Sequence, residues 1–328
     1  MSSCFQRRFG MKPLRTVACL SIASTLLGAP AWAQFKPAAE HSAAQAKETA
    51  QAPVFSANVN LVRLLVSVRD SNGALITNLD RRDFRVLDSG VEQTISLFER
   101  NTSVPLSVAL MIDTSASTRA DLHFEEDSVL RFVPTLLEAG NPDDTFALFS
   151  FNWHVTLESD FSRNPRHAER ALHALRGDGG TSLYDAIYLV SDTLSTREGR
   201  HVVVLVTDGG DTTSYKKYQD ALAAAQRSDV VIYPVVVIPI ASDAGRNTGG
   251  EHALATLAAS TGGRIFYPEG FERLDAAFAD ILHELRTQYL LGYYPRDVQQ
   301  QPRSFHPIKI EVPNAPVRIS ARSGYYQP

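Results

Sequence analysis

The chain has 328 residues, of which 44% are hydrophobic and 21% are charged, a composition that is typical of a globular protein with one large or two smaller domains. Residues 1–33 contain four basic side chains and no acidic one, which leaves 28 of the 32 basic and all 36 acidic side chains, a net charge of -8, to the remainder. An acidic remainder without a basic block argues against a nucleic-acid partner.

Residues 1–33 predict a signal peptide. A basic start precedes the apolar run 17–27, and Ala31-Trp32-Ala33 is a small-x-small cleavage site. The apolar run is too short to cross a membrane comfortably, so we expect cleavage after about Ala33 rather than a retained anchor. The protein is then exported, periplasmic or secreted, without a membrane span in the mature chain. Both cysteines, Cys4 and Cys19, lie in this segment, so the mature chain has no disulfide and no thiolate site.

Residues 34–53 have little to bury and are interpreted as a linker. Residues 54–101 form a β-rich flank: a strand pattern starts at Phe55, a turn signal covers 70–73, and two further strands are expected at 84–90 and 93–98. Three strands alone are marginally stable, so this flank needs a partner.

Strand and helix patterns alternate between residues 102 and 287. Apolar strands are expected at 106–112, 146–151, 202–207 and 230–237, and helices at 122–139, 167–175, 183–194, 218–227, 252–260 and 271–286. This alternation predicts an α/β fold with a doubly wound, mostly parallel sheet. Residues 153–157 are expected to add an antiparallel edge strand.

The last residues, 288–328, return to strands, expected at 289–294, 307–312 and 317–321. Their length and character match those of residues 54–101. We therefore predict that the two flanks pack together as one small β-rich domain into which the α/β domain is inserted.

Three segments of the α/β region end in oxygen-bearing side chains. Asp113, Ser115 and Ser117 follow the strand 106–112, Thr181 lies in a Gly-rich loop at a helix start, and Asp208 follows the strand 202–207. Loops after neighbouring strands of a doubly wound sheet converge on one edge. Two carboxylates with neutral hydroxyls suit a hard divalent cation, Mg²⁺ or alternatively Mn²⁺ or Ca²⁺.

The order of these segments resembles the von Willebrand factor A (VWA) domain, a Rossmann-like fold, and its metal-ion-dependent adhesion site (MIDAS), over about residues 104–286. The flanking residues 288–295 and 322–326 are similar to those of exported bacterial VWA-related proteins of the acidobacterial type. The resemblance implies a non-enzymatic, cation-dependent adhesion or scaffold module, in which a Glu or Asp carboxylate of a protein partner completes the metal coordination. It also implies the ligands: hydroxyl oxygens from Ser115, Ser117 and Thr181, and carboxylates of Asp113 and Asp208 bound directly or through water.

Other interpretations of the same residues are weaker. Standing alone, Asp113-x-Ser115-x-Ser117 would be a turn or a helix cap. A phosphatase of the haloacid dehalogenase type would use Asp113 as its nucleophile, but it needs a second acid two residues later, where this chain has Ser115. Asp185 is expected at a helix start or in support of the site, and Asp211 as a solvated loop acid. The chain has no HExxH pattern, so a zinc site is not expected.

Overall fold

The fold is known from a computed structural model, which describes residues 61–119, 122–138, 140–237, 248–269, 273–299, 301, 303–313 and 315–327. All of these belong to one unit of the chain, residues 57–328. The expected signal peptide and linker lie outside the described residues. Within them, no helix is both long enough and apolar enough to cross a membrane.

A five-stranded sheet with the order β7-β6-β5-β8-β9 forms the centre of the α/β domain. Strands β5, β6, β8 and β9 are parallel, and β7 is an antiparallel edge strand. The predicted fold class is therefore confirmed. The elements of this domain are β5 (Leu106–Asp113), α1 (Leu122–Glu138), β6 (Thr145–Phe151), β7 (Val155–Ser162), α2 (Pro165–Leu172), α3 (Leu183–Ser195), β8 (Arg200–Thr207), α4 (Tyr218–Arg227), β9 (Val230–Val236), α5 (Thr248–Thr261) and α6 (Leu274–Thr287).

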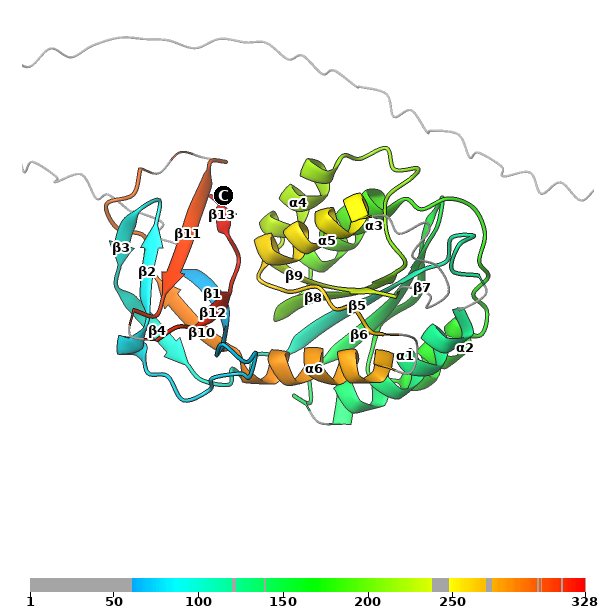
Figure 1. Ribbon diagram of the computed structural model, residues 1–328, viewed down its shortest axis with the longest axis horizontal. Coiled ribbons are helices and arrows are strands. Elements are labelled where there is room, and N and C mark those ends of the chain that lie inside the picture. Colours follow the sequence, from blue (N-terminus) through cyan, green and yellow to red (C-terminus); the bar gives the residue numbers. More distant parts are fainter. Residues whose placement is uncertain are drawn as a thin grey trace, which may run out of the picture. The chain divides into compact units, whose positions relative to one another are not determined.

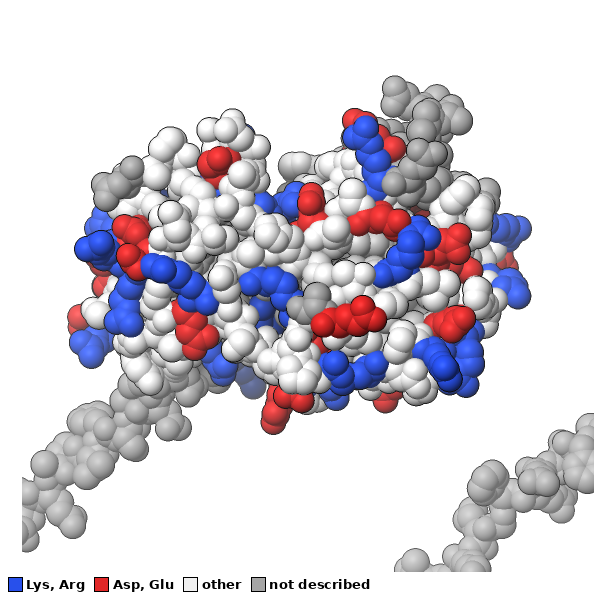
Figure 2. All heavy atoms as spheres, turned by 90° about the horizontal axis from the view of Figure 1, so that it is seen from below, with Lys and Arg blue, Asp and Glu red and all other residues white. Residues whose placement is uncertain are grey.

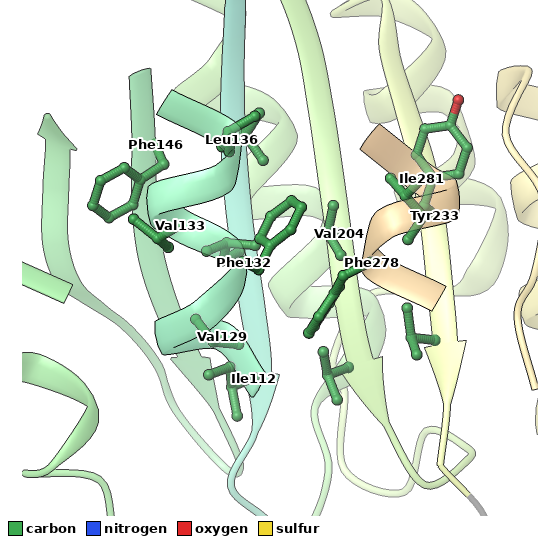
Figure 3. Close-up of a cluster of buried hydrophobic side chains, with 14 of the residues drawn as sticks. Ile112, Val129, Phe132, Val133, Leu136, Phe146, Val204, Tyr233, Phe278 and Ile281 are labelled. Atoms are coloured by element: carbon green, nitrogen blue, oxygen red, sulfur yellow. The ribbon is translucent and has the colours of Figure 1, made fainter. Parts of the chain in front are cut away.

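Helices cover both faces of this sheet, which is why all eight residues of β5 are buried. Helices α1, α2 and α6 cover one face of the sheet, and α3, α4 and α5 cover the other (Figure 1). Because side chains alternate along a strand, Val108 and Ile112 pack with the first set of helices, whereas Ala109 and Met111 pack with the second. The two helices α1 and α6 meet over the first face, where the rings of Phe132 and Phe278 stack at 4.8 Å (Figure 3). The sheet is thus held rigidly from both sides.

The flanks of the chain form two four-stranded antiparallel sheets, with the orders β12-β1-β10-β4 and β13-β11-β2-β3. Each sheet combines strands from both flanks, as the prediction of one β-rich domain requires. The strands are β1 (Val62–Arg69), β2 (Arg85–Asp88), β3 (Val91–Gln93), β4 (Ile95–Glu99), β10 (Tyr289–Tyr293), β11 (Phe305–Glu311), β12 (Arg318–Ser320) and β13 (Gly324–Tyr326), with a short 3-10 helix at Arg81–Asp83.

The core of the β-rich domain contains a buried acid. Asp88 is fully buried, and its carboxylate accepts hydrogen bonds from the hydroxyls of Tyr293 at 2.9 Å and Tyr325 at 3.0 Å. Burial and the neighbouring negative charge of Asp88 raise the pKa of both tyrosines, so both hydroxyls keep their protons and donate.

Two details of the β-rich domain differ from the prediction. Residues 93–98 do not form one strand, because the chain leaves β3, which pairs with β2, and enters β4, which pairs with β10 in the other sheet. Both sheets bury one face, so the alternation of side chains gives no signal where the chain changes sheets. The additional strand β13 is only three residues long and was too short to be detected from the sequence.

Buried polar contacts join α6 to both domains. Glu284 of α6 is fully buried and forms ion pairs with Arg69 of β1 and, at 3.0 Å, with Arg264. Just after α6, the amide of Gln288 donates to Ser67 Oγ at 3.3 Å. The end of α6 is therefore fixed to β1 by charge as well as by chain connection.

Candidate metal centre

The candidate metal centre lies at the carboxyl edge of the α/β sheet. From β5 the chain crosses to β6 on one side, and β8 lies on the other side of β5, so the topological switch point falls between β5 and β8. Asp113 is the last residue of β5, and Asp208 directly follows β8. The fold thus places both predicted carboxylates at the position where open α/β sheets form their sites.

Asp113 is fully buried and is held by two hydrogen bonds. Its Oδ2 accepts from Thr207 Oγ1 at 2.6 Å, and its Oδ1 accepts from the backbone N–H of Ser115 at 2.9 Å. Burial raises the pKa of Asp113 from 3.8 to about 6; the two hydrogen bonds oppose this, and the negative charge of Asp208 adds to it. A nearby positive charge would stabilise the ionised form of the buried Asp113 carboxylate.

Two serine hydroxyls follow Asp113 in the loop between β5 and α1. Ser115 is buried, Ser117 is exposed, and their Oγ atoms lie 3.0 Å apart. The loop is held by Thr118, whose hydroxyl donates to the carbonyl oxygens of Asp113 at 2.9 Å and Ser115 at 3.1 Å. The serine oxygens therefore stand together beside the Asp113 carboxylate, as a shared ligand set requires.

The Gly-rich loop that carries Thr181 is bonded to both other loops of the site. Its Gly179 carbonyl accepts from the N–H of Ala116 at 3.0 Å. On the other side, the N–H of Thr181 donates to Thr212 Oγ1 at 2.8 Å, and the Thr181 carbonyl accepts from the N–H of Thr212 at 2.8 Å. The Thr181 backbone is therefore fixed, while its hydroxyl makes no hydrogen bond to a described residue.

The five predicted residues thus lie on three loops that are connected by hydrogen bonds. Ser115 contacts both Asp113 and Ser117, and Thr181 and Asp208 come from the two other loops. Neither Asp113 nor Asp208 forms an ion pair with any described basic side chain, although the charge of one affects the other. The described residues contain no group of three or more His, Cys, Asp or Glu side chains that could hold a metal. The donors that are present, two carboxylates and three hydroxyls, fit a hard divalent cation.

Several residues that support the site were not identified from the sequence as such. The sequence places Thr207 only at the end of a strand, and its hydrogen bond to Asp113 depends on the pairing of β5 with β8. The sequence predicts Trp153 in an edge strand, but this residue precedes β7, and its indole lies beside Gly179 and Gly180 of the Gly-rich loop. A Cβ added at Gly180 would come within 2.6 Å of Thr213 Cγ2 and 2.7 Å of Trp153 Nε1, so a side chain at this position requires these two side chains or the loop to shift.

The two other acids of the region hold loops. The carboxylate of Asp185 accepts from the N–H groups of Tyr215 at 3.0 Å and Lys216 at 2.7 Å, which agrees with a supporting role. Asp211 is bonded to Ser214 and accepts from the N–H of Tyr184 at 3.4 Å. It is half-buried and structural, so the expectation of a solvated loop acid was wrong for Asp211.

Comparisons with known proteins concern this α/β domain. Residues 108–210 match the family model described as von Willebrand factor type A domain. Among solved structures, the chain is similar to the vWF domain of the type V pili tip protein Mfa5 from Porphyromonas gingivalis, at 16% identity and a TM-score of 0.45 over 56% of this chain and 95% of that one. It is also similar to the conserved hypothetical protein BatB from Bacteroides thetaiotaomicron, at 17% identity and a TM-score of 0.43 over 55% and 97% of the two chains.

A third similar structure is proximal thread matrix protein 1 from the mussel byssus, at 18% identity and a TM-score of 0.47, covering 61% of this chain and 51% of that one. Identities and scores this low say nothing about ligands or partners. A search among curated proteins gives no significant match.

Proposed function

This chain carries a von Willebrand factor type A domain, and from that premise we propose that it is a protein-binding module whose partner recognition depends on a divalent cation. The cation, Mg²⁺ or alternatively Mn²⁺ or Ca²⁺, would be held by Asp113, Ser115, Ser117, Thr181 and Asp208. The partner would offer a Glu or Asp carboxylate, and the role would be adhesion or scaffolding without catalysis.

One observation carries the proposal: the three loops with all five donor side chains are bonded together at the switch point of the sheet. The link between Asp113 and Thr207 joins the ends of β5 and β8, and the link between Ala116 and Gly179 joins the first loop to the second. All five ligand positions that the resemblance to the VWA domain implies carry an oxygen-bearing side chain in this chain.

The charge balance of the donors supports a carboxylate as the partner group. A bound divalent cation would supply a positive centre that polarises oxygen ligands. The two acids neutralise its charge, and the hydroxyls of Ser115, Ser117 and Thr181 add none, so a further anion remains attractive. Since Ser117 is exposed, the site is accessible from solvent on the side of that loop.

The role as a binding module is tested with the variant Thr181→Ala. Its hydroxyl makes no hydrogen bond to a described residue, so its removal should leave the fold intact, and Thr256→Ala on the exposed side of α5 is the matched control. Calorimetry with Mg²⁺ and capture of partners from an envelope extract, each with and without EDTA, give two independent readouts. We expect Thr181→Ala and EDTA to reduce both; partner capture that persists fully in EDTA would refute the proposed mechanism.

On the basis of the sequence of residues 1–33, we also propose that the protein is exported and is periplasmic or secreted. Fractionation of cells followed by N-terminal sequencing tests this directly. A mature protein that starts near Gln34 outside the cytoplasm is expected; an intact N-terminus in the cytoplasm would contradict export.

A further inference from the structure

A second candidate site lies at the opposite edge of the α/β sheet from the metal centre. A cavity of about 490 Å³ opens at the starts of β8 and β9, next to β1 and β10 of the β-rich domain. We call it the arginine cavity, because its charged lining consists of His201 and the following six residues: Arg63, Arg197, Arg200, Arg322, Glu198 and Asp229. Its volume is within the range of small-molecule sites.

The charges in the arginine cavity are unbalanced. Four arginines face two acids, and one of the acids, Asp229, is already paired with Arg322. The guanidinium of Arg63 forms no ion pair or hydrogen bond with a described residue, and that of Arg197 lies over the ring of Phe161 at 4.6 Å. The lining of the cavity therefore carries more positive charge than its two acids neutralise. Over the face drawn in Figure 2, basic and acidic side chains are interspersed.

Two of these arginines are fixed by the protein itself. Arg200 is buried and donates from Nη1 to the carbonyl of Leu285 at 2.8 Å and from Nη2 to Gln288. Arg322 donates from Nη2 to the carbonyl of Arg63 at 2.7 Å. Such held guanidinium groups lose little entropy when they bind an anion.

Both held arginines also have an unused donor. The Nε–H groups of Arg200 and Arg322 are buried and find no acceptor among the described residues. Burial lowers the pKa of each to about 10, so both remain charged at neutral pH. Both Nε–H groups are closed off from solvent, so an anion in the cavity would be attracted by the charge of the two guanidinium groups and would not have to reach Nε.

We propose that the arginine cavity binds a small organic anion that carries a carboxylate or phosphate group on an apolar body. Guanidinium groups are suited to the oxygens of carboxylates and phosphates, with which they form paired, charge-assisted hydrogen bonds. The apolar body is accommodated by the remaining wall, to which Leu65, Val104 and Leu290 contribute. Carboxylate and phosphate ligands both offer anionic oxygens, and the experiment distinguishes between the two.

The bound anion would contact both domains. Arg63 belongs to β1, Arg322 follows β12, and Arg200 begins β8, so a ligand on all three links the β-rich domain to the α/β domain. A ligand that binds only the folded protein raises its melting temperature. Binding should not require the metal centre, so EDTA leaves it unchanged.

The test uses the full chain with three probes of one ring size: benzoate, phenyl phosphate and the uncharged benzyl alcohol. Calorimetry and thermal melting are measured in EDTA, for the wild type and for Arg63→Glu. The matched control is Arg81→Glu, an exposed arginine outside the cavity with the same change of charge. A third variant, Val104→Phe, fills part of the cavity without changing its charge.

We expect benzoate or phenyl phosphate to bind and benzyl alcohol not to bind. Arg63→Glu should weaken the binding by about tenfold or more, because it removes a charge-assisted contact and adds a repulsive one. Val104→Phe should weaken it as well, and Arg81→Glu should leave it unchanged. Binding of one probe alone identifies the oxyanion class.

Three results would overturn the proposal. The first is that neither anion binds at millimolar concentration. The second is that benzyl alcohol binds as well as the anions, since the cavity then recognises only the apolar ring. The third is that Arg63→Glu and Arg81→Glu weaken binding equally, since the effect is then one of overall charge.

Discussion

Replacement of the buried acid Asp113 by asparagine should change stability in opposite directions with and without metal. The raised pKa of Asp113, about 6 instead of 3.8, means that the folded, metal-free protein disfavours the charged carboxylate. The stability that the neutral carboxyl of Asp113 contributes is fully present below 3.8, its pKa in the unfolded chain. This contribution is lost as the pH rises through about 6, its pKa in the folded protein. At pH 7 the metal-free wild type therefore carries the full cost of a buried charge.

The size of this cost follows from the shift. About two pKa units at about 1.4 kcal/mol each amount to about 3 kcal/mol. Asp113→Asn removes that cost, but when its single oxygen accepts from the N–H of Ser115, its amide nitrogen takes the place of Oδ2 and cannot accept from Thr207, a loss of about 1 kcal/mol. In EDTA at neutral pH the variant should thus be more stable than the wild type by about 2 kcal/mol. Near pH 4 this advantage disappears.

Urea denaturation followed by the fluorescence of Trp153 measures the difference, at several pH values and in EDTA or excess Mg²⁺. Because a ligand stabilises only the state that binds it, Mg²⁺ should stabilise the wild type and reverse the order of the two proteins. Parallel pH profiles of the two proteins in EDTA would refute the buried-charge argument. Equal stabilisation of both by Mg²⁺ would refute Asp113 as a metal ligand.

Three further changes have defined outcomes. Gly180→Ala places a Cβ within 2.7 Å of the Trp153 indole and should weaken Mg²⁺ binding about tenfold in calorimetry, by displacing the loop of Thr181; unchanged affinity would show that the loop adjusts freely. Glu284→Ala leaves the largely buried Arg69 without its acid and Arg264 with only Asp280, and it should destabilise the protein by about 3–5 kcal/mol in urea denaturation, whereas a loss below about 1 kcal/mol would mean that the ion pairs are dispensable. Asp88→Ala deprives two tyrosine hydroxyls of their acceptor and should cost about 2–3 kcal/mol by the same assay, with a neutral effect counting against the buried network.

Local patterns in the sequence were sufficient for the elements of the α/β domain. The uninterrupted apolar run before Asp113 predicted a strand covered on both faces, and the spacing of Leu274, Phe278 and Ile281 predicted the inner side of α6, all of which are buried. These features depend on the period of a strand or a helix, which each segment carries by itself. The three oxygen-bearing segments were recognised for the same reason, since each directly follows a strand or opens a helix.

Contacts between distant segments were decided only by the tertiary structure. The bond of Thr207 to Asp113 requires β8 to lie beside β5, and the change of sheet at Thr94 has no signature in the alternation of side chains. The arginine cavity depends most on long-range packing, because Arg63, Arg200 and Arg322 come from three regions of the chain. A period of hydrophobicity states which face of an element is buried, but it does not state which other element covers that face. Charged side chains such as these have no period at all, so their meeting is visible only in the folded protein.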